Sequence, residues 1–66
     1  MYKKIIIYTL KESSEIIAAE GNTLEYLMNS YGQYMVVSIR EIDTNGETIR
    51  TVIHRDWSHI ELFVTA

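Results

Sequence analysis

Apolar residues in this chain fall into short runs separated by polar residues, a pattern typical of β-strands. Residues 3–10 (KKIIIYTL) contain three consecutive isoleucines and predict a central strand covered on both faces. Residues 15–21 (EIIAAEG) follow a short polar turn and predict a second strand paired with the first. The alternative is one long helix over residues 14–31, which the two alanines favour.

The next segment predicts a short helix over residues 22–32 (NTLEYLMNSYG). Asn22 suits a helix N-cap, and Glu25 is placed to complete a capping box. Gly32 suits the left-handed position after a helix. Apolar side chains spaced at i, i+3, i+4 and i+7 form one stripe, which consists of Leu24, Leu27, Met28 and Tyr31.

Three further strands are predicted, at residues 33–43, 47–57 and 58–66. The fold class is therefore α+β, with the order ββαβββ: a small, mostly antiparallel sheet with one short helix packed on one face. With the longer helix over 14–31 the order becomes βαβββ. The predicted core consists of Ile5, Ile7, Leu24, Leu27, Met28, Val37, Ile39, Ile53 and Leu62.

The hairpin tip at Asn45-Gly46 decides which side chains share a face of the sheet. With a two-residue loop, Glu41 faces Arg50 and Ile39 faces Val52, so charged and aliphatic residues are mixed on each face.

A three-residue loop, Thr44-Asn45-Gly46 with Gly46 left-handed, gives a different register, in which Ile39 faces Thr51. It collects aliphatic side chains on one face, namely Met35, Val37, Ile39, Ile49 and Ile53. A slip of one residue moves every side chain to the other face, so this sorted register is the one predicted. The second face then carries Arg40, Arg50, Val52 and His54.

Composition favours a single small domain over residues 1–66 that gains stability by association. A chain of 66 residues, 47% of them hydrophobic, is too apolar to be disordered. A domain of this size buries only about 60% of its unfolded surface. The chain contains no cysteine and so no stabilising disulfide, and a homodimer or higher homo-oligomer is therefore expected. The lack of cysteine also fits a cytoplasmic location, and no signal peptide or membrane span is recognisable.

No catalytic or cofactor site is expected. The serines lack the pattern of a nucleophile elbow, and the three glycines are isolated, so no phosphate-binding loop is present. His54, Asp56 and His59 form an H-x-D-x-x-H pattern whose residue types suit zinc, but no fourth ligand accompanies them. We therefore predict no metal site and no enzyme.

Nucleic-acid binding is an alternative function. Five tyrosines occur in the chain, and Tyr8 near Lys4 or Tyr34 near Arg40 has the aromatic and basic character that stacks on bases. The net charge of -3 and the lack of a basic cluster speak against it.

The leading hypothesis is a non-catalytic protein-interaction module, a small inhibitor or regulator of a larger protein. Arginine and aromatic residues among aliphatic ones are enriched in interfaces, so the predicted partner-binding residues are Arg40, Arg50, Val52, His54 and Trp57. A third hypothesis is a purely structural homo-oligomer.

Residues 14–42 (SEIIAAEGNTLEYLMNSYGQYMVVSIREI) support the first hypothesis in outline. Their predicted order of strand, capped helix and strand is similar, in size and element order, to several small phage-encoded inhibitors of host enzymes. That resemblance implies a viral inhibitor. It involves no shared motif, so no residue role is transferred.

Overall fold

The computed structural model describes residues 2–32 and 34–64, and these form an all-β fold. The described residues contain no helix, and therefore no helix of the length and apolarity that crossing a membrane requires. The six strands are β1 (Lys4–Thr9), β2 (Ser13–Ile17), β3 (Thr23–Tyr31), β4 (Tyr34–Ile42), β5 (Thr48–Arg55) and β6 (Trp57–Phe63).

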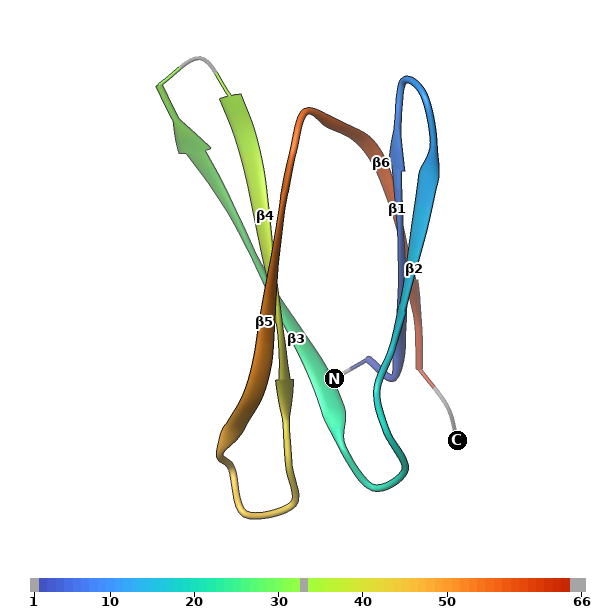
Figure 1. Cartoon of the computed structure of the whole chain (residues 1–66), viewed down its shortest axis with the longest axis vertical. Coiled ribbons are helices and arrows are strands. Elements are labelled where there is room, and N and C mark those ends of the chain that lie inside the picture. Colours follow the sequence, from blue (N-terminus) through green and yellow to red (C-terminus); the bar gives the residue numbers. More distant parts are fainter. Residues whose placement is uncertain (1, 33, 65–66) are drawn as a thin grey trace.

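The strands form two antiparallel sheets of three strands each. The first sheet has the order β2-β1-β6 and the second has the order β3-β4-β5, so each has one central and two edge strands. Figure 1 shows the two sheets beside one another, with the second on the left. The predictions that residues 3–10 form a central strand and residues 15–21 a strand paired with it are confirmed in outline by β1 and β2.

The predicted helix over residues 22–32 is wrong, and so are the α+β fold class and the alternative helix over 14–31. Residues Thr23–Tyr31 are an extended strand that pairs with β4 over nine consecutive positions. Leu24, Tyr26 and Met28 also alternate with Thr23, Glu25 and Leu27, so the segment fits the strand period as well as the helical one. Pairing with β4 gives this segment cross-strand hydrogen bonds along its length, whereas a helix this short is only marginally stable on its own.

The loss of this helix also removes the basis of the resemblance to phage-encoded inhibitors. The order strand, helix, strand is replaced over residues 14–42 by three strands.

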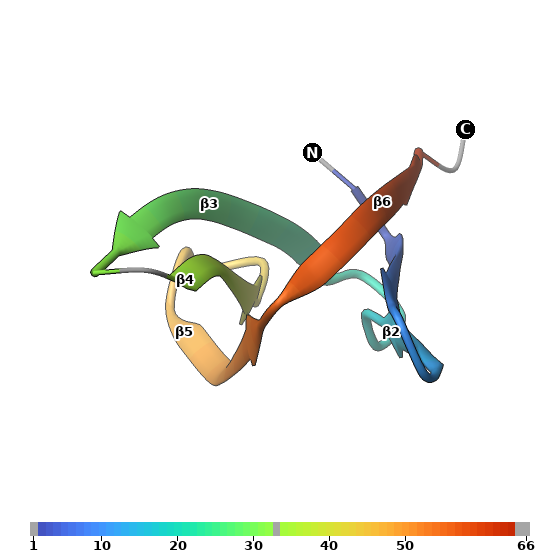
Figure 2. The ribbon, with the colours of Figure 1, turned by 90° about the horizontal axis from the view of Figure 1, so that it is seen from above.

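Two of the places at which the sheets are joined involve a β-bridge and a sharp corner of the chain. Near the start of the chain, Tyr2 forms a β-bridge with Leu24, exchanging backbone hydrogen bonds with it in both directions. At the other place, β5 passes directly into β6 through Asp56, which has a left-handed φ of 57°. Viewed from above, β6 leaves the end of β5 and crosses to the first sheet (Figure 2).

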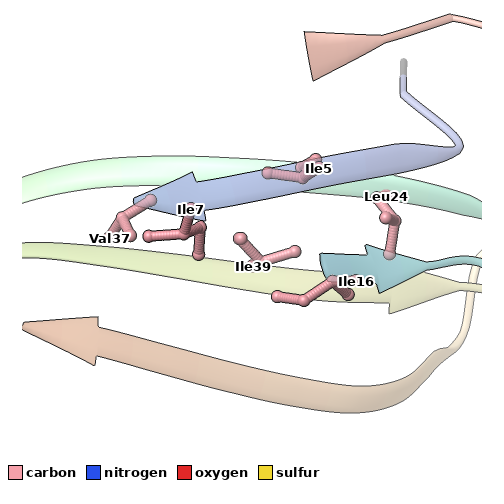
Figure 3. Packing of buried hydrophobic residues seen from close by; sticks show 6 residues of the cluster. All are labelled: Ile5, Ile7, Ile16, Leu24, Val37 and Ile39. Atoms are coloured by element: carbon pink, nitrogen blue, oxygen red, sulfur yellow. The ribbon is translucent and has the colours of Figure 1, made fainter. Parts of the chain in front are cut away.

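The core lies between the inner faces of the two sheets (Figure 3). Its six buried aliphatic side chains are Ile5, Ile7, Ile16, Leu24, Val37 and Ile39. Leu62 packs against this cluster from β6. Three residues predicted for the core are instead exposed, because they point to the opposite side of a strand or lie at an edge: Leu27, Met28 and Ile53.

The hairpin between β4 and β5 explains why Ile53 is exposed. Its tip is the predicted three-residue loop: Asp43 and Glu47 close it, and Gly46 has a φ of 84°. A second irregularity then follows, because β5 bulges by one residue at Ile49, between the Ile42–Thr48 and Glu41–Arg50 pairs.

This bulge reverses the predicted pattern of faces. Beyond it, Ile39 faces Val52 and Val37 faces His54, which is the register that the two-residue loop predicts. The predicted sorted register is therefore wrong for the body of the hairpin, although its turn is correct. Arg50, Val52 and His54 share the inner face with Ile39, and Arg40 lies on the other face.

Candidate interaction surface

The face of the second sheet that points away from the core is the candidate site, and we call it the outer face. Antiparallel partners lie side by side on one face, so the pairings define its rows. Across the centre, Leu27 of β3, Ser38 of β4 and Ile53 of β5 form one row. The neighbouring row on one side is Asn29, Val36 and Arg55. On the other side it is Glu25, Arg40 and Thr51, and the row beyond that is Thr23, Ile42 and Thr48.

The central row has an aliphatic side chain at each end, Leu27 and Ile53, and the short side chain of Ser38 between them. Leu27 is 60% exposed and Ile53 is 62% exposed. Adjacent strands are about 4.8 Å apart, so these two side chains stand roughly 10 Å apart with the short Ser38 between them. A hollow at this position is lined by Glu25, Tyr26, Leu27, Ser38, Arg40 and Thr51.

One ion pair borders this hollow. The Arg40 Nη2 and Nε atoms donate to Glu25 Oε2 at 2.7 and 3.1 Å across the β3–β4 pair. Because both side chains are half exposed, the pair adds little stability, but it cancels the charge beside Leu27 and Ser38. Beside this neutralised pair, the described rows of the outer face carry one further charged residue, Arg55.

The exposed face of the first sheet is different, because charged side chains lie between its exposed apolar ones, Ile17 and Phe63. Lys4 Nζ lies 2.8 Å from Glu15 Oε1 and 5.3 Å from the centre of the Phe63 ring. The Tyr8 hydroxyl donates to Glu61 at 3.4 Å. Desolvation of the hydroxyl and the neighbouring Glu61 charge raise the pKa of Tyr8 above its ordinary value. This face resembles ordinary solvated protein surface rather than a contact patch.

A polar network ties the two sheets together behind the outer face. The Glu41 carboxylate is only 5% exposed and accepts hydrogen bonds from Asn22 Nδ2 at 2.6 Å, Arg50 Nε at 2.7 Å and Ala19 N at 3.2 Å. Arg50 Nη2 also donates to the Ile17 carbonyl at 2.7 Å. The bonds from Asn22 and Ala19, together with the Arg50 charge, hold the pKa of Glu41 below its usual value. This network positions β2 and the 18–22 loop against β4 and β5.

Comparison of the chain with protein-family models, curated proteins and solved structures gives no match. Its function is therefore inferred from its own side chains.

The five predicted partner-binding residues do not share one face. Only Arg40 lies on the outer face, where it pairs with Glu25. Arg50 belongs to the Glu41 network, and Val52 and Trp57 pack against the core. His54 is half-buried on the inner side of β5, opposite Val37. The predicted grouping depended on the sorted register, which the bulge at Ile49 removes.

The histidine and aspartate pattern is also spread out. His54 lies on the inner face of β5, whereas Asp56 forms the corner between the sheets. His59 packs its ring 5.5 Å from that of Tyr8 and lies 3.6 Å from Glu61. Within residues 2–32 and 34–64, no three potential metal-ligating side chains come together.

Two of the basic residues considered for nucleic-acid binding are held in ion pairs. Lys4 binds Glu15 and Arg40 binds Glu25. The Tyr8 hydroxyl is directed to Glu61. The prediction that pairs Tyr34 with Arg40 concerns a side chain outside the described part of the structure.

The two residues that mark the outer face, Leu27 and Ile53, are predicted from the sequence to lie in the core, and this prediction is wrong for both. A signal for Ile53 was available: the possible Glu41–Arg50 cross-strand charge pair belongs to the observed register. For Leu27, the polar neighbours Glu25 and Asn29 at two-residue spacing indicate a strand with Leu27 on its polar side.

Proposed function

We propose that the protein is a non-catalytic interaction module that binds a larger protein through its outer face, and that it inhibits or regulates that protein by covering its surface. The carrying observation is the row Leu27–Ser38–Ile53, two exposed aliphatic side chains on either side of a small one on the outer face. Exposed apolar groups gathered on one face mark interaction sites more often than scattered ones do.

The side chains of the outer face indicate what kind of partner surface would bind to it. An apolar side chain of the partner would insert over Ser38, between Leu27 and Ile53. Because Glu25 and Arg40 neutralise each other, little charge attraction is needed, and binding would be driven mainly by burial of apolar area. The cytoplasmic location expected from the lack of cysteine belongs to the same proposal.

The test is affinity capture from cells that produce the protein, with Leu27→Asp and Ile53→Asp as the face variants. Ile17→Asp is the matched control, since Ile17 is 56% exposed but belongs to β2 of the first sheet. We expect both face variants to lose the captured protein and the control to retain it. Retention by the face variants would move the contact surface elsewhere.

The salt dependence of binding distinguishes this proposal from nucleic-acid binding. Phosphate contacts release counterions, so nucleic-acid affinity falls steeply as salt rises, whereas an apolar contact is nearly insensitive. We expect captured protein to remain bound when the salt concentration is raised several-fold. Steep loss together with recovery of nucleic acid would favour the alternative.

A further inference from the structure

The outward edge of β3 is open beyond its first residues. β3 is the outermost strand of the second sheet, and it pairs with β4 on one side only. On its other side, Leu24 exchanges hydrogen bonds with Tyr2. Backbone groups alternate in direction along a strand, so the N–H and C=O groups of Tyr26, Met28 and Ser30 point the same way as those of Leu24. No described strand pairs with them.

This edge lacks the features with which proteins block unwanted pairing. Lysine, proline and bulges are the usual protection, and β3 (TLEYLMNSY) contains none of them. Its single charge, Glu25, is neutralised by Arg40.

The other edge strands are protected. β5 bulges at Ile49 and carries Arg55. β6 has an irregular register at Ser58, and β2 is only five residues long. The open edge of β3 is therefore distinctive among the four.

We propose that two copies of the chain pair antiparallel along β3, with Met28 on the two-fold axis. In this register Tyr26 faces Ser30 of the second copy, and Ser30 faces its Tyr26. Tyr26, Met28 and Ser30 of each strand then lie opposite residues whose backbone N–H and C=O groups point toward them. This arrangement permits six backbone hydrogen bonds between the two strands. A six-stranded sheet results.

The ends of β3 fit the same register. In this register Gly32 of the second copy lies opposite Leu24, whose outward edge already pairs with Tyr2. Strand β3 of the second copy ends at Tyr31, one residue before this point. The second strand therefore ends where the free edge ends. The two Glu25 residues stand at opposite ends of the paired region, about 20 Å apart along the strands, so no like charges face each other.

Apolar surface beside the edge supports the same partner. Met28 is 48% exposed on the inner side of β3, beside a hollow lined by Tyr26, Met28, Trp57, Ser58, His59, Ile60 and Leu62. Two Met28 side chains would meet there. The accessible surface of the chain is 4834 Å², whereas a monomer of 7.7 kDa exposes about 4,300 Å². Pairing would cover part of this excess.

This inference goes beyond the proposed function, since it uses a strand edge rather than a sheet face. It also has a consequence for that function. The two-fold axis at a hydrogen-bonded pair runs perpendicular to the sheet, so both outer faces would lie on the same side. The dimer would present two Leu27–Ser38–Ile53 rows to one partner surface.

Sedimentation equilibrium of the full chain across the micromolar range tests the pairing, with Met28→Lys as the disrupting variant. Two lysines facing each other on the axis should weaken association by at least about tenfold. Ile53→Lys is the control, because Ile53 lies on the opposite edge strand. We expect a dimer mass for the wild type and the control, and the mass of one chain for Met28→Lys.

A cross-linking variant gives a second readout that does not depend on losing the dimer. The chain contains no cysteine, so Met28→Cys provides a single thiol. Hydrogen-bonded antiparallel partners have Cα atoms about 5.5 Å apart, within the range of a disulfide. We expect Met28→Cys to form a covalent dimer on mild oxidation much faster than Ile53→Cys. A wild type that stays a single chain, or equal cross-linking at both positions, would overturn the proposal; loss of partner capture alone would leave it intact.

Discussion

Shortening Ile39 and Ile53 to valine gives the clearest contrast that the structure predicts. Both residues are isoleucines in neighbouring strands of one hairpin, and both would be buried on the same face in the sorted register. In the observed register Ile39 is 1% exposed and Ile53 is 62% exposed. The same change therefore removes a methylene from the core at one position and from solvent-facing surface at the other.

The expected difference is large for a domain of this size. Ile39→Val should lower the free energy of unfolding by about 1 kcal/mol, the usual cost of this change in a core. Ile53→Val should change it by less than about 0.5 kcal/mol, because valine suits a strand as well as isoleucine does. A 66-residue domain has a total stability of roughly 3–10 kcal/mol. The first change should therefore lower the Tm by about 4–8 °C.

Urea unfolding followed by far-ultraviolet circular dichroism measures both variants against the wild type. The slope of the free energy with urea should stay the same in all three proteins, so that a shift in midpoint reports stability alone. Measurements at matched protein concentration keep any self-association equal. Equal losses at the two positions, or a larger loss at Ile53, would refute the observed register and restore the sorted one.

Three further predictions concern single side chains. The lowered pKa of Glu41 means that its stabilising contribution is present above its ordinary value of 4.5 and is lost as the pH falls through the lower folded value, so Glu41→Gln should flatten the acid side of a stability–pH profile; an unchanged slope would contradict this. The raised pKa of Tyr8 means that stability falls as the pH rises above 10.0, the ordinary value, and Tyr8→Phe should reduce that alkaline loss in the same profile. At the corner between the sheets, Asp56 has a left-handed φ, so Asp56→Val should cost about 1–2 kcal/mol in urea unfolding while Asp56→Gly costs less; equal costs would show that φ is not the cause.

Parts of the fold follow from local sequence signals. Consecutive isoleucines in residues 3–10 indicate a central strand, and Gly46 indicates the turn, because each signal depends on residues that are close in the chain. Both predictions are confirmed, and the predicted strands at 33–43, 47–57 and 58–66 correspond to β4, β5 and β6.

The helix at residues 22–32 was predicted wrongly because two periods coexist there. Leu24, Leu27 and Met28 suit a helix, and Leu24, Tyr26 and Met28 suit a strand. The pairing with β4 decides between them, and that pairing is not encoded within the segment itself.

The candidate site was predicted only in part, for a related reason. A single bulged residue, Ile49, exchanges the two faces of β5 while leaving the turn unchanged. Isoleucine at position 49 gives no sequence signal for a bulge. Arg40 stayed on the predicted face, whereas Arg50, Val52 and His54 moved to the inner one.

Cross-strand nuclear Overhauser effects between Hα protons test the arrangement of the second sheet most directly. In non-hydrogen-bonded antiparallel pairs the backbones approach most closely, at a Cα separation of about 4.5 Å. The structure places Tyr26 opposite Ile39 and Ser38 opposite Ile53 in such pairs. We expect strong Hα–Hα cross-peaks for both. Helical contacts within residues 23–31, or a cross-peak joining Ser38 to Val52 in place of Ile53, would contradict the outer face and everything proposed for it.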